Sequence, residues 1–329
     1  MNIVYICNEI NLKNGWGVVS YHTIRNSLKF FDEVTVITNK KANNVTSFSD
    51  CHNLRVFPIL HSINNSALKM GLIAIDRISI KRHCNIIDTD IVHILVEPLL
   101  PLVNIFKNSK KIFSIHGTYS DILFKAGFNQ FLFRGSLKKI DRILSNSEYT
   151  KNRFNNIYKQ EISVIPLGID NESFRVTEID TLRERAFVFV GHLKIRKGLI
   201  YALEAFKNIM RNDEKVLFYI IGAVSIGQYA DTCLNYIKKN KMNKQVVFLG
   251  KVDDNNLIEI YNKSICNLLP SVNDENHYEG FGLVHLEANA CGTPTIGSID
   301  CGNESAIING KTCLLYTSPS PRDAHESRM

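Results

Sequence analysis

Short apolar runs alternate with helical stretches along this chain, and the whole alternation occurs twice. The first series runs from Ile3–Cys7 to Ile162–Ile165, and the second runs from Phe187–Val190 to Thr295–Ile296. Strands that alternate regularly with helices form a parallel sheet with helices on both faces. The pattern therefore predicts an α/β protein made of two doubly wound, Rossmann-like domains.

The two series are separated by residues 170–184, which are polar and lack periodicity. Such a stretch is typical of a linker, and 329 residues are enough for two domains. We therefore predict a first domain of residues 1–170, a linker of residues 171–185 and a second domain of residues 186–312. Doubly wound sheets bind ligands outside the carboxyl ends of their strands, so we expect the site in a cleft between the domains.

The last stretch, residues 313–329, is polar, contains two prolines and lacks periodicity. It resembles translated adaptor or cloning sequence, so we expect a non-native tail. A strand candidate lies near Thr312–Tyr316, and no helical pattern follows it. Because the strands of a doubly wound sheet are apolar on both faces, we expect the second domain to be incomplete and to leave apolar surface exposed.

Composition indicates a globular protein of the cytoplasm. Apolar residues make up 45% of the chain and charged residues 22%, and no run of about 18 uninterrupted apolar residues predicts a membrane span. The first residues do not have the pattern of a secretory signal. The eight cysteines form no C-x-x-C pair and none has zinc-finger spacing from a histidine. We interpret them as reduced structural thiols and expect no metal site.

Basic charge is concentrated in the first half of the chain. Residues 61–160 hold 15 Lys and Arg against 7 Asp and Glu, whereas the whole chain has a net charge of +7. This distribution favours an anionic partner for the first domain. Nucleic acid is not expected, because no Lys/Arg-rich run or nucleic-acid-binding motif is present.

Aromatic and basic residues are interleaved in the segment Phe124–Arg142. One interpretation is peripheral contact with an anionic membrane surface or a lipid-linked acceptor. The other is a core helix with a solvated basic edge.

Three motifs of the first domain come after predicted strands. Gly15 and Gly17 precede the first helix, where glycines either let a phosphate approach the backbone or only form a turn. Their spacing is not G-x-G-x-x-G, so a dinucleotide cofactor is not supported. His116 either points into the expected cleft or is structural. The Pro-x-Gly turn at residues 166–168 is either a domain boundary or a loop that lines the cleft.

The second domain contains a cationic loop between a strand and a helix. This loop runs from Gly191 to Gly198 and carries His192, Arg196 and Lys197. It is either a solvated basic loop or a site where a diphosphate meets these cations together with the helix dipole.

A second motif of this domain pairs two glutamates eight residues apart. Glu279 lies in a loop, and Glu287 lies inside the helix that follows it. Gly280 and Gly282 expose backbone N–H groups at the start of that helix, where an anion can dock. Glu287 is placed to accept hydrogen bonds from ribose hydroxyls. Either glutamate alone is typical of a solvated helix face, but the combination indicates a nucleotide site.

Taken together, these motifs resemble those of the retaining glycosyltransferases of family 4, which have the GT-B fold. The resemblance covers residues 1 to about 312 with the motifs in the same order, and the E-x7-E motif is its most specific part. The matching residues are Gly15-x-Gly17, His116-Gly117, Ile165–Asp170, Gly191 with Lys197-Gly198, Glu279 with Glu287, and Ala290–Pro294.

The resemblance implies transfer of a sugar from a nucleotide-sugar donor to a glycan or lipid-linked acceptor, without a metal or other cofactor, in polysaccharide or glycolipid synthesis. A departing nucleoside diphosphate develops negative charge, so fixed cations and helix N-termini are the main requirement. The implied roles are ribose binding by Glu287, sugar binding by Glu279 and the backbone of Gly280, Phe281, Gly282 and Leu283, diphosphate contact by Lys197 and Gly17, and a place beside the sugar for His116.

One position departs from the family pattern. The family usually has arginine directly after the glycine that corresponds to Gly191, and this chain has His192 there. Either His192 is charged by the bound diphosphate, or Arg196 substitutes for it, or the cationic clamp is weaker.

Two other functions fit the same motifs. A sugar-nucleotide epimerase also uses the GT-B fold and needs no acceptor. A non-catalytic sugar-nucleotide-binding protein would bind without turnover, although the complete set of Glu279, Glu287, Lys197 and His116 favours an enzyme. A dinucleotide dehydrogenase is disfavoured, because the glycine fingerprint is absent.

Overall fold

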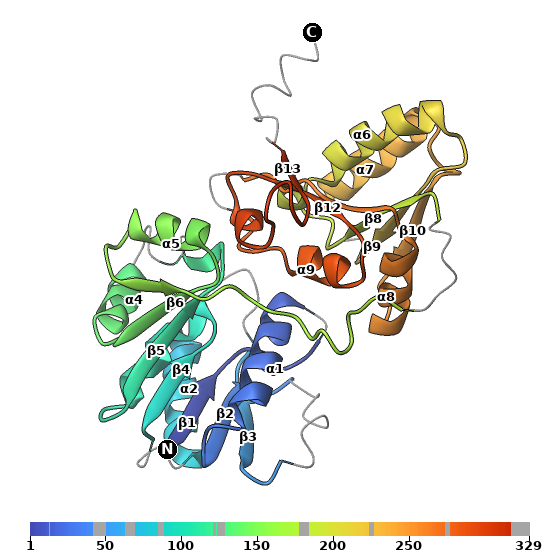
Figure 1. The fold of residues 1–329 in the computed structure, drawn as a ribbon. Coiled ribbons are helices and arrows are strands. Elements are labelled where there is room, and N and C mark those ends of the chain that lie inside the picture. Colours follow the sequence, from blue (N-terminus) through green and yellow to red (C-terminus); the bar gives the residue numbers. More distant parts are fainter. Residues whose placement is uncertain are drawn as a thin grey trace. The chain divides into compact units, whose positions relative to one another are not determined.

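The computed structural model describes residues 1–316 except residues 13, 42–50, 63–69, 85–88, 121–122, 124–128, 178–183, 224–226 and 274–276. The chain forms two compact units, Met1–Ile165 and Pro166–Met329 (Figure 1). The boundary therefore lies just before the Pro-x-Gly turn rather than at residue 170, and the described part of the predicted linker belongs to the second unit.

The first unit is built on a sheet in which all neighbouring strands are parallel, in the order β3-β2-β1-β4-β5-β6-β7. The order reverses between β1 and β4, which pair through Ile3 and Ile91. The elements are β1 (Asn2–Ile6), α1 (Gly15–Ser27), β2 (Glu33–Asn39), β3 (Leu54–Leu60), α2 (Met70–His83), β4 (Ile91–Ile94), the 3-10 helix η2 (Glu97–Ile105), β5 (Lys110–Ile115), α4 (Asn129–Leu137), β6 (Arg142–Ser145), α5 (Glu148–Asn155) and β7 (Ile162–Val164).

Both faces of this sheet are buried. Val4 and Ile6 of β1 belong to one apolar cluster, whereas the alternate residues Ile3 and Tyr5 belong to another. Side chains of a strand point alternately to opposite faces, so continuous apolar runs are what a parallel sheet with two covered faces requires. The predicted doubly wound architecture is thereby confirmed for this unit.

The second unit repeats the architecture with parallel strands in the order β10-β9-β8-β11-β12-β13. The order reverses between β8 and β11. The elements are β8 (Ala186–Val190), the 3-10 helix η3 (Ile195–Lys197), α6 (Leu199–Asn212), β9 (Leu217–Ile221), α7 (Gln228–Lys239), β10 (Val246–Gly250), α8 (Asp254–Lys263), β11 (Cys266–Leu269), α9 (Leu283–Ala290), β12 (Thr295–Ser298), the 3-10 helix η4 (Gly302–Ser305) and β13 (Leu314–Tyr316).

Helices cover both faces of this second sheet. α6 and α7 pack with Phe189 of β8, and α8 and α9 pack with the preceding residue, Val188 (Figure 1). The edge strand β13 pairs with β12 through Leu314 and Ile296. Residues 314–316 of the expected tail are therefore part of the sheet, and residues 317–329 lie outside the described residues.

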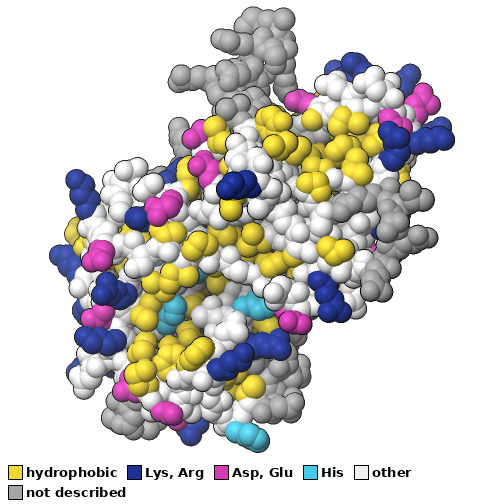
Figure 2. Space-filling model, in the orientation of Figure 1, with side chains coloured by type: hydrophobic (Ala, Val, Ile, Leu, Met, Phe, Trp, Pro, Cys, Tyr) yellow, Lys and Arg dark blue, Asp and Glu magenta, His cyan; other side chains and the backbone are white. Residues whose placement is uncertain are grey.

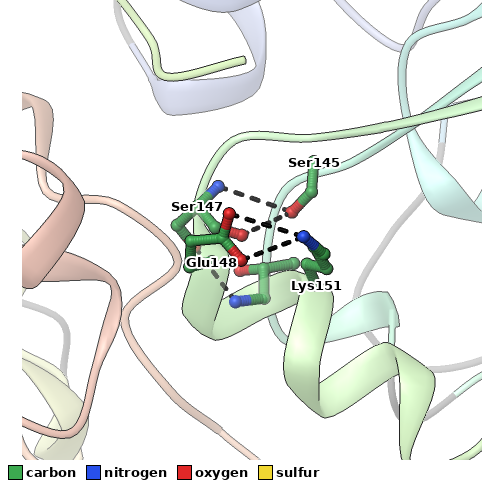
Figure 3. Close-up of polar contacts among 5 residues, drawn as sticks. Ser145, Ser147, Glu148 and Lys151 are labelled. Carbon is green, nitrogen blue, oxygen red and sulfur yellow. Dashed lines mark hydrogen bonds and ion pairs between the residues drawn. The ribbon is translucent and has the colours of Figure 1, made fainter. Parts of the chain in front are cut away.

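Turns at the carboxyl ends of strands are fixed by side-chain hydrogen bonds. Between β6 and α5, the Ser145 hydroxyl donates to the Ser147 carbonyl at 2.8 Å, and the Ser147 Oγ accepts from the N–H of Thr150 at 3.0 Å (Figure 3). Ser147 is thereby the N-cap of α5. Glu148 and Lys151 add an ion pair of 3.1 Å on the first turn. The turn places Asn146 at the carboxyl edge of the sheet.

All eight cysteines are free thiols, as the sequence predicts, and most are buried. Within the described ranges, no helix has the length and apolar character needed to cross a membrane.

Candidate active site

The candidate site of the second unit lies where its strand order reverses. The basic loop with η3 follows β8, the Glu279 loop follows β11, and these two strands are neighbours. Loops that leave the carboxyl ends of strands on either side of such a reversal diverge and leave a crevice for a ligand. The fold therefore brings together two motifs that are far apart in the sequence.

Glu279 is held by two cations of the basic loop. One carboxylate oxygen, Oε2, lies 2.5 Å from Nη1 of Arg196 and 2.7 Å from Nζ of Lys197. The Glu279 side chain is 9% exposed, and Lys197 is 13% exposed. Burial alone would raise the pKa of Glu279, but the charges of Arg196 and Lys197 lower it to about 2. The carboxylate is therefore ionised at neutral pH, with two cations on one of its oxygens.

The side chain of Lys197 is mostly buried and lies among charged groups. Burial lowers its pKa, whereas Glu279 and Glu287 act in the opposite direction. The loop is anchored to the segment after β11 by a hydrogen bond from the N–H of Val272 to the carbonyl of Arg196 at 2.9 Å. Gly198 then adopts a left-handed φ of +69° to start α6. An anion that binds here meets a cation whose backbone is fixed before binding.

Glu287 lies on α9 and is partly buried. It accepts a hydrogen bond from the hydroxyl of Tyr261 of α8 at 3.4 Å. Burial raises the pKa of Glu287 to about 7, and only Tyr261 and Lys197 lower it. In the free protein this second glutamate therefore carries a proton for part of the time, unlike Glu279.

The raised pKa of Glu287 predicts a pH dependence of stability. The ordinary pKa is 4.5 and the folded value is about 7, so the folded state binds the proton more tightly than the unfolded state. The stabilisation is fully present below pH 4.5 and is lost as the pH rises to about 7. The loss amounts to about 3 kcal/mol. Glu287→Gln removes it, so the variant should gain melting temperature relative to the wild type between pH 5 and pH 8. If the difference in melting temperature between the variant and the wild type is the same at pH 5 and pH 8, the pKa of Glu287 is not raised.

The start of α9 is built around glycines. Gly282 is the N-cap of α9 with a φ of +90°, and among the described residues no side chain forms a capping hydrogen bond to this helix. Phe281 beside it is 3% exposed. Behind the turn, the buried His285 shares a 2.5 Å hydrogen bond with the hydroxyl of Thr295. A helix N-terminus with a rigid backing and no capping side chain is suited to an anionic or polar ligand.

His192 does not join the ion-pair cluster. The residue as a whole is exposed, but partial burial of its ring, together with Lys194 and other neighbouring cations, lowers its pKa. It is therefore neutral at neutral pH in the free protein. Of the three possibilities for this position, the geometry favours Arg196 as the second cation. Gly191 lies at the end of β8, where a Cβ would lie 3.6 Å from the Lys197 side chain.

The predicted residues of the first unit lie at the carboxyl edge of its own sheet. Gly15 is the first residue of α1, and the N–H of Gly17 donates to the Asn14 side chain at 3.0 Å. This bond caps α1 with a protein group at the position where a phosphate contact was expected. His116 is half-buried, and both of its ring nitrogens are enclosed. Burial lowers its pKa to about 4, against a smaller opposite effect of the Leu95 carbonyl.

Sequence reasoning missed two polar residues of this edge, Glu97 after β4 and Asn146 after β6. Both contact the backbone of His116: Glu97 Oε1 accepts from its N–H at 2.7 Å, and Asn146 donates to its carbonyl at 2.9 Å. The signal that identified His116, a polar residue directly after an apolar strand, was also present for Glu97 and Asn146.

In the part of the chain that the structure describes, no group of three or more His, Cys, Asp and Glu side chains is arranged to hold a metal ion.

Two family models match adjoining segments of the chain. One is glycosyltransferase family 4, over residues 14–173, and the other is glycosyl transferases group 1, over residues 171–327. The glycogen synthase of Mycobacterium tuberculosis is 32% identical over 164 residues, which are 50% of this chain and 37% of that protein. An uncharacterised glycosyltransferase of Methanocaldococcus jannaschii is 27% identical over 215 residues, or 65% of this chain and 56% of that one. The matches thus span less than two thirds of either relative.

Solved structures show the same fold over the whole chain. The HepE protein of Anabaena, in complex with UDP and glucose, is 17% identical with a TM-score of 0.72, covering 99% of this chain and 88% of that one. The sucrose-phosphate synthase of Thermosynechococcus elongatus is 16% identical with a TM-score of 0.76 and the same coverage. Because both family models match in chain order and both sheets have their counterparts in these structures, the chain belongs to the family 4, group 1 glycosyltransferases with the GT-B fold.

Proposed function

We propose that this protein is a retaining, metal-independent glycosyltransferase that moves a sugar from a nucleotide-sugar donor to a glycan or lipid-linked acceptor. The observation that carries the proposal is the pair of cations, Arg196 and Lys197, bound to Glu279 at the reversal of the second sheet. The uncapped start of α9 belongs to the same set of loops. Cations and a helix N-terminus are the groups that stabilise a departing diphosphate.

In this proposal the diphosphate and Glu279 compete for the same cations. A nucleotide-sugar that places its diphosphate against Lys197 and Arg196 weakens their hold on Glu279. The Glu279 carboxylate then becomes available to accept hydrogen bonds from hydroxyl groups of the donor sugar. Glu287, whose partner in the free protein is the Tyr261 hydroxyl at 3.4 Å, accepts from the ribose. Charge on the leaving group is stabilised without a metal ion.

The structure of HepE in complex with UDP and glucose supports a uridine nucleotide as the first donor to test. We propose synthesis of a cell-surface polysaccharide or glycolipid as the setting, in the cytoplasm. An epimerase and a non-catalytic binding protein remain the competing functions, and both would bind the same nucleotide.

A ligand screen followed by turnover assays tests the proposal. At a concentration of 100 times its dissociation constant, a true donor should stabilise the protein by about 2.7 kcal/mol. UDP-, GDP- and ADP-sugars are compared by thermal shift, and the binder is then incubated with EDTA and a panel of acceptors. Transfer that survives EDTA and keeps the anomeric configuration, read by NMR, is expected. Interconversion of the donor alone would indicate an epimerase, and binding without turnover would indicate a binding protein.

Peripheral membrane contact is a separate proposal for the first unit. Of the aromatic–basic segment Phe124–Arg142, residues 124–128 lie outside the described residues. Phe133 is fully buried and Leu132 packs against the core, so among the described aromatic residues of this segment Phe131, 81% exposed, is the one available for lipid. On the face drawn in Figure 2, Lys and Arg side chains are scattered among acidic ones.

Liposome flotation measures this contact. Salt-sensitive binding to anionic vesicles that Phe131→Ala weakens is expected if the segment meets the membrane. Equal recovery with neutral and anionic vesicles would identify α4 as an ordinary core helix with a basic edge.

A further inference from the structure

The side chain of Glu97 is buried, although removing a carboxyl group from water costs free energy. Glu97 is the first residue of η2, the element that follows β4 in the chain, and it is 1% exposed. Its Oε1 accepts hydrogen bonds from the N–H groups of His116 at 2.7 Å and Gly117 at 3.3 Å. Its Oε2 is enclosed, without a hydrogen-bond partner among the described residues. A buried carboxyl group is costly unless hydrogen bonds offset the lost solvation, so the contacts of Oε1 with these two amides are what hold Glu97 in this place.

The same short loop is held from a second direction. Asn146 donates from Nδ2 to the His116 carbonyl at 2.9 Å, and it lies between Ser145 and Ser147 of the rigid turn in Figure 3. The three neighbouring strands β4, β5 and β6 thus each provide one part of the arrangement. The backbone of His116 is fixed at both its N–H and its carbonyl, while its two ring nitrogens are enclosed.

We propose that Glu97 is a positioning residue for sugar transfer, which sets the place of His116 by binding the N–H groups of residues 116 and 117 at one oxygen. The proposal rests on the proposed function, in which His116 lies beside the transferred sugar. Glu97 does not touch substrate in this role. A misplacement of about 1 Å in a group beside the reacting atoms can reduce the rate about a hundredfold. Hydrogen bonds that fix the backbone of His116 can therefore affect the rate of transfer.

Two variants separate the role of Glu97 from general stability. Glu97→Ala removes the acceptor, whereas Glu97→Gln keeps an oxygen in the position of Oε1. The matched control is Asp76→Ala, which removes another carboxylate of the first unit that is 3% exposed. Asp76 accepts from the N–H of His61 at 3.1 Å and so holds a different loop.

Hydrogen–deuterium exchange of the peptide spanning residues 112–120 measures how firmly the amides of residues 116 and 117 are bound, and it needs no substrate. Exchange at residues 116 and 117 should be about tenfold faster in Glu97→Ala and within about threefold of wild type in Glu97→Gln and Asp76→Ala. Unchanged exchange in Glu97→Ala would overturn the proposal whatever the activity of the protein.

Turnover then tests whether the hold serves transfer. In folded Glu97→Ala, kcat should fall about tenfold or more, with the dissociation constant for UDP unchanged because the second unit binds it, and Glu97→Gln should restore most of the rate. Faster exchange with normal kcat, or equal losses in Glu97→Ala and Asp76→Ala, would overturn the positioning role. If the wild type turns over no donor, the proposed function fails and the role in transfer fails with it. The exchange result would still decide whether Glu97 holds the loop.

Discussion

Lys197→Ala should lower turnover of the nucleotide-sugar by about a hundredfold or more, the loss that follows removal of one group that stabilises developing negative charge. The physical reason is the position of the ammonium group, which is 13% exposed and lies 2.7 Å from Glu279. A charge in a mostly desolvated site acts more strongly than the same charge in water. The measurement is kcat with a saturating donor, at a pH where the folded fraction of the variant equals that of the wild type.

The matched control for this prediction is Lys194→Ala. Lys194 belongs to the same basic loop and carries the same charge, but its side chain is exposed. We expect its removal to change kcat by less than about threefold, because exposed charges are screened by solvent. The kcat of Arg196→Ala should lie between those of Lys197→Ala and Lys194→Ala, and the kcat of His192→Ala should be close to that of the wild type. Comparable rates for Lys197→Ala and Lys194→Ala would show that the loop attracts the donor only through its overall charge.

Strand and helix positions in the second unit were predictable wherever an apolar run has sharp ends. The hydrophobic pattern of the sequence predicts helices over Gln228–Lys239 and Leu283–Ala290, and both coincide with helices of the structure, α7 and α9. Helix α2 could not be found in this way. Ile73 and Ile80 are buried in the core, but Ile75 and Ile78 on the same helix are 51% and 67% exposed. Apolar residues on several faces hide the helical period, and only tertiary packing decides which face is covered.

The charged residues that meet in the second unit, Arg196, Lys197 and Glu279, were all candidates from the sequence, but their pairing was not predictable. Each motif was recognisable because a charged or polar residue directly follows an apolar strand, and in a parallel sheet such residues share one edge. The contact between Arg196 and Glu279 joins residues 83 positions apart, and it depends on β8 and β11 being neighbours. Local sequence does not contain that information. For the same reason, the sequence did not predict which of His192 and Arg196 lies beside Lys197.

Gly198→Ala should destabilise the second unit by about 3 kcal/mol or more, which is large for a single methyl group. Gly198 has a φ of +69°, and a Cβ at this position would lie 1.8 Å from the carbonyl oxygen of Pro270. That oxygen belongs to the backbone directly after β11, so no side chain can rotate away to relieve the clash. The start of α6 and the segment after β11 must move apart, and η3 with Lys197 must move with them. We therefore expect lower thermal stability and weaker nucleotide binding together.

Gly250→Ala separates the two causes of this loss, because Gly250 has nearly the same φ, +67°, but a Cβ there would meet nothing within 4 Å. Left-handed strain alone costs roughly 1 to 3 kcal/mol for a residue other than glycine, so Gly250→Ala measures that strain in the same unit. The further loss in Gly198→Ala reports the contact with Pro270, and only this variant should lose nucleotide affinity, because only it displaces Lys197. If both substitutions cost the same and both leave UDP binding unchanged, then the two loops are not packed as closely as the structure has them, and the rigid placement of Lys197 beside Glu279 is wrong.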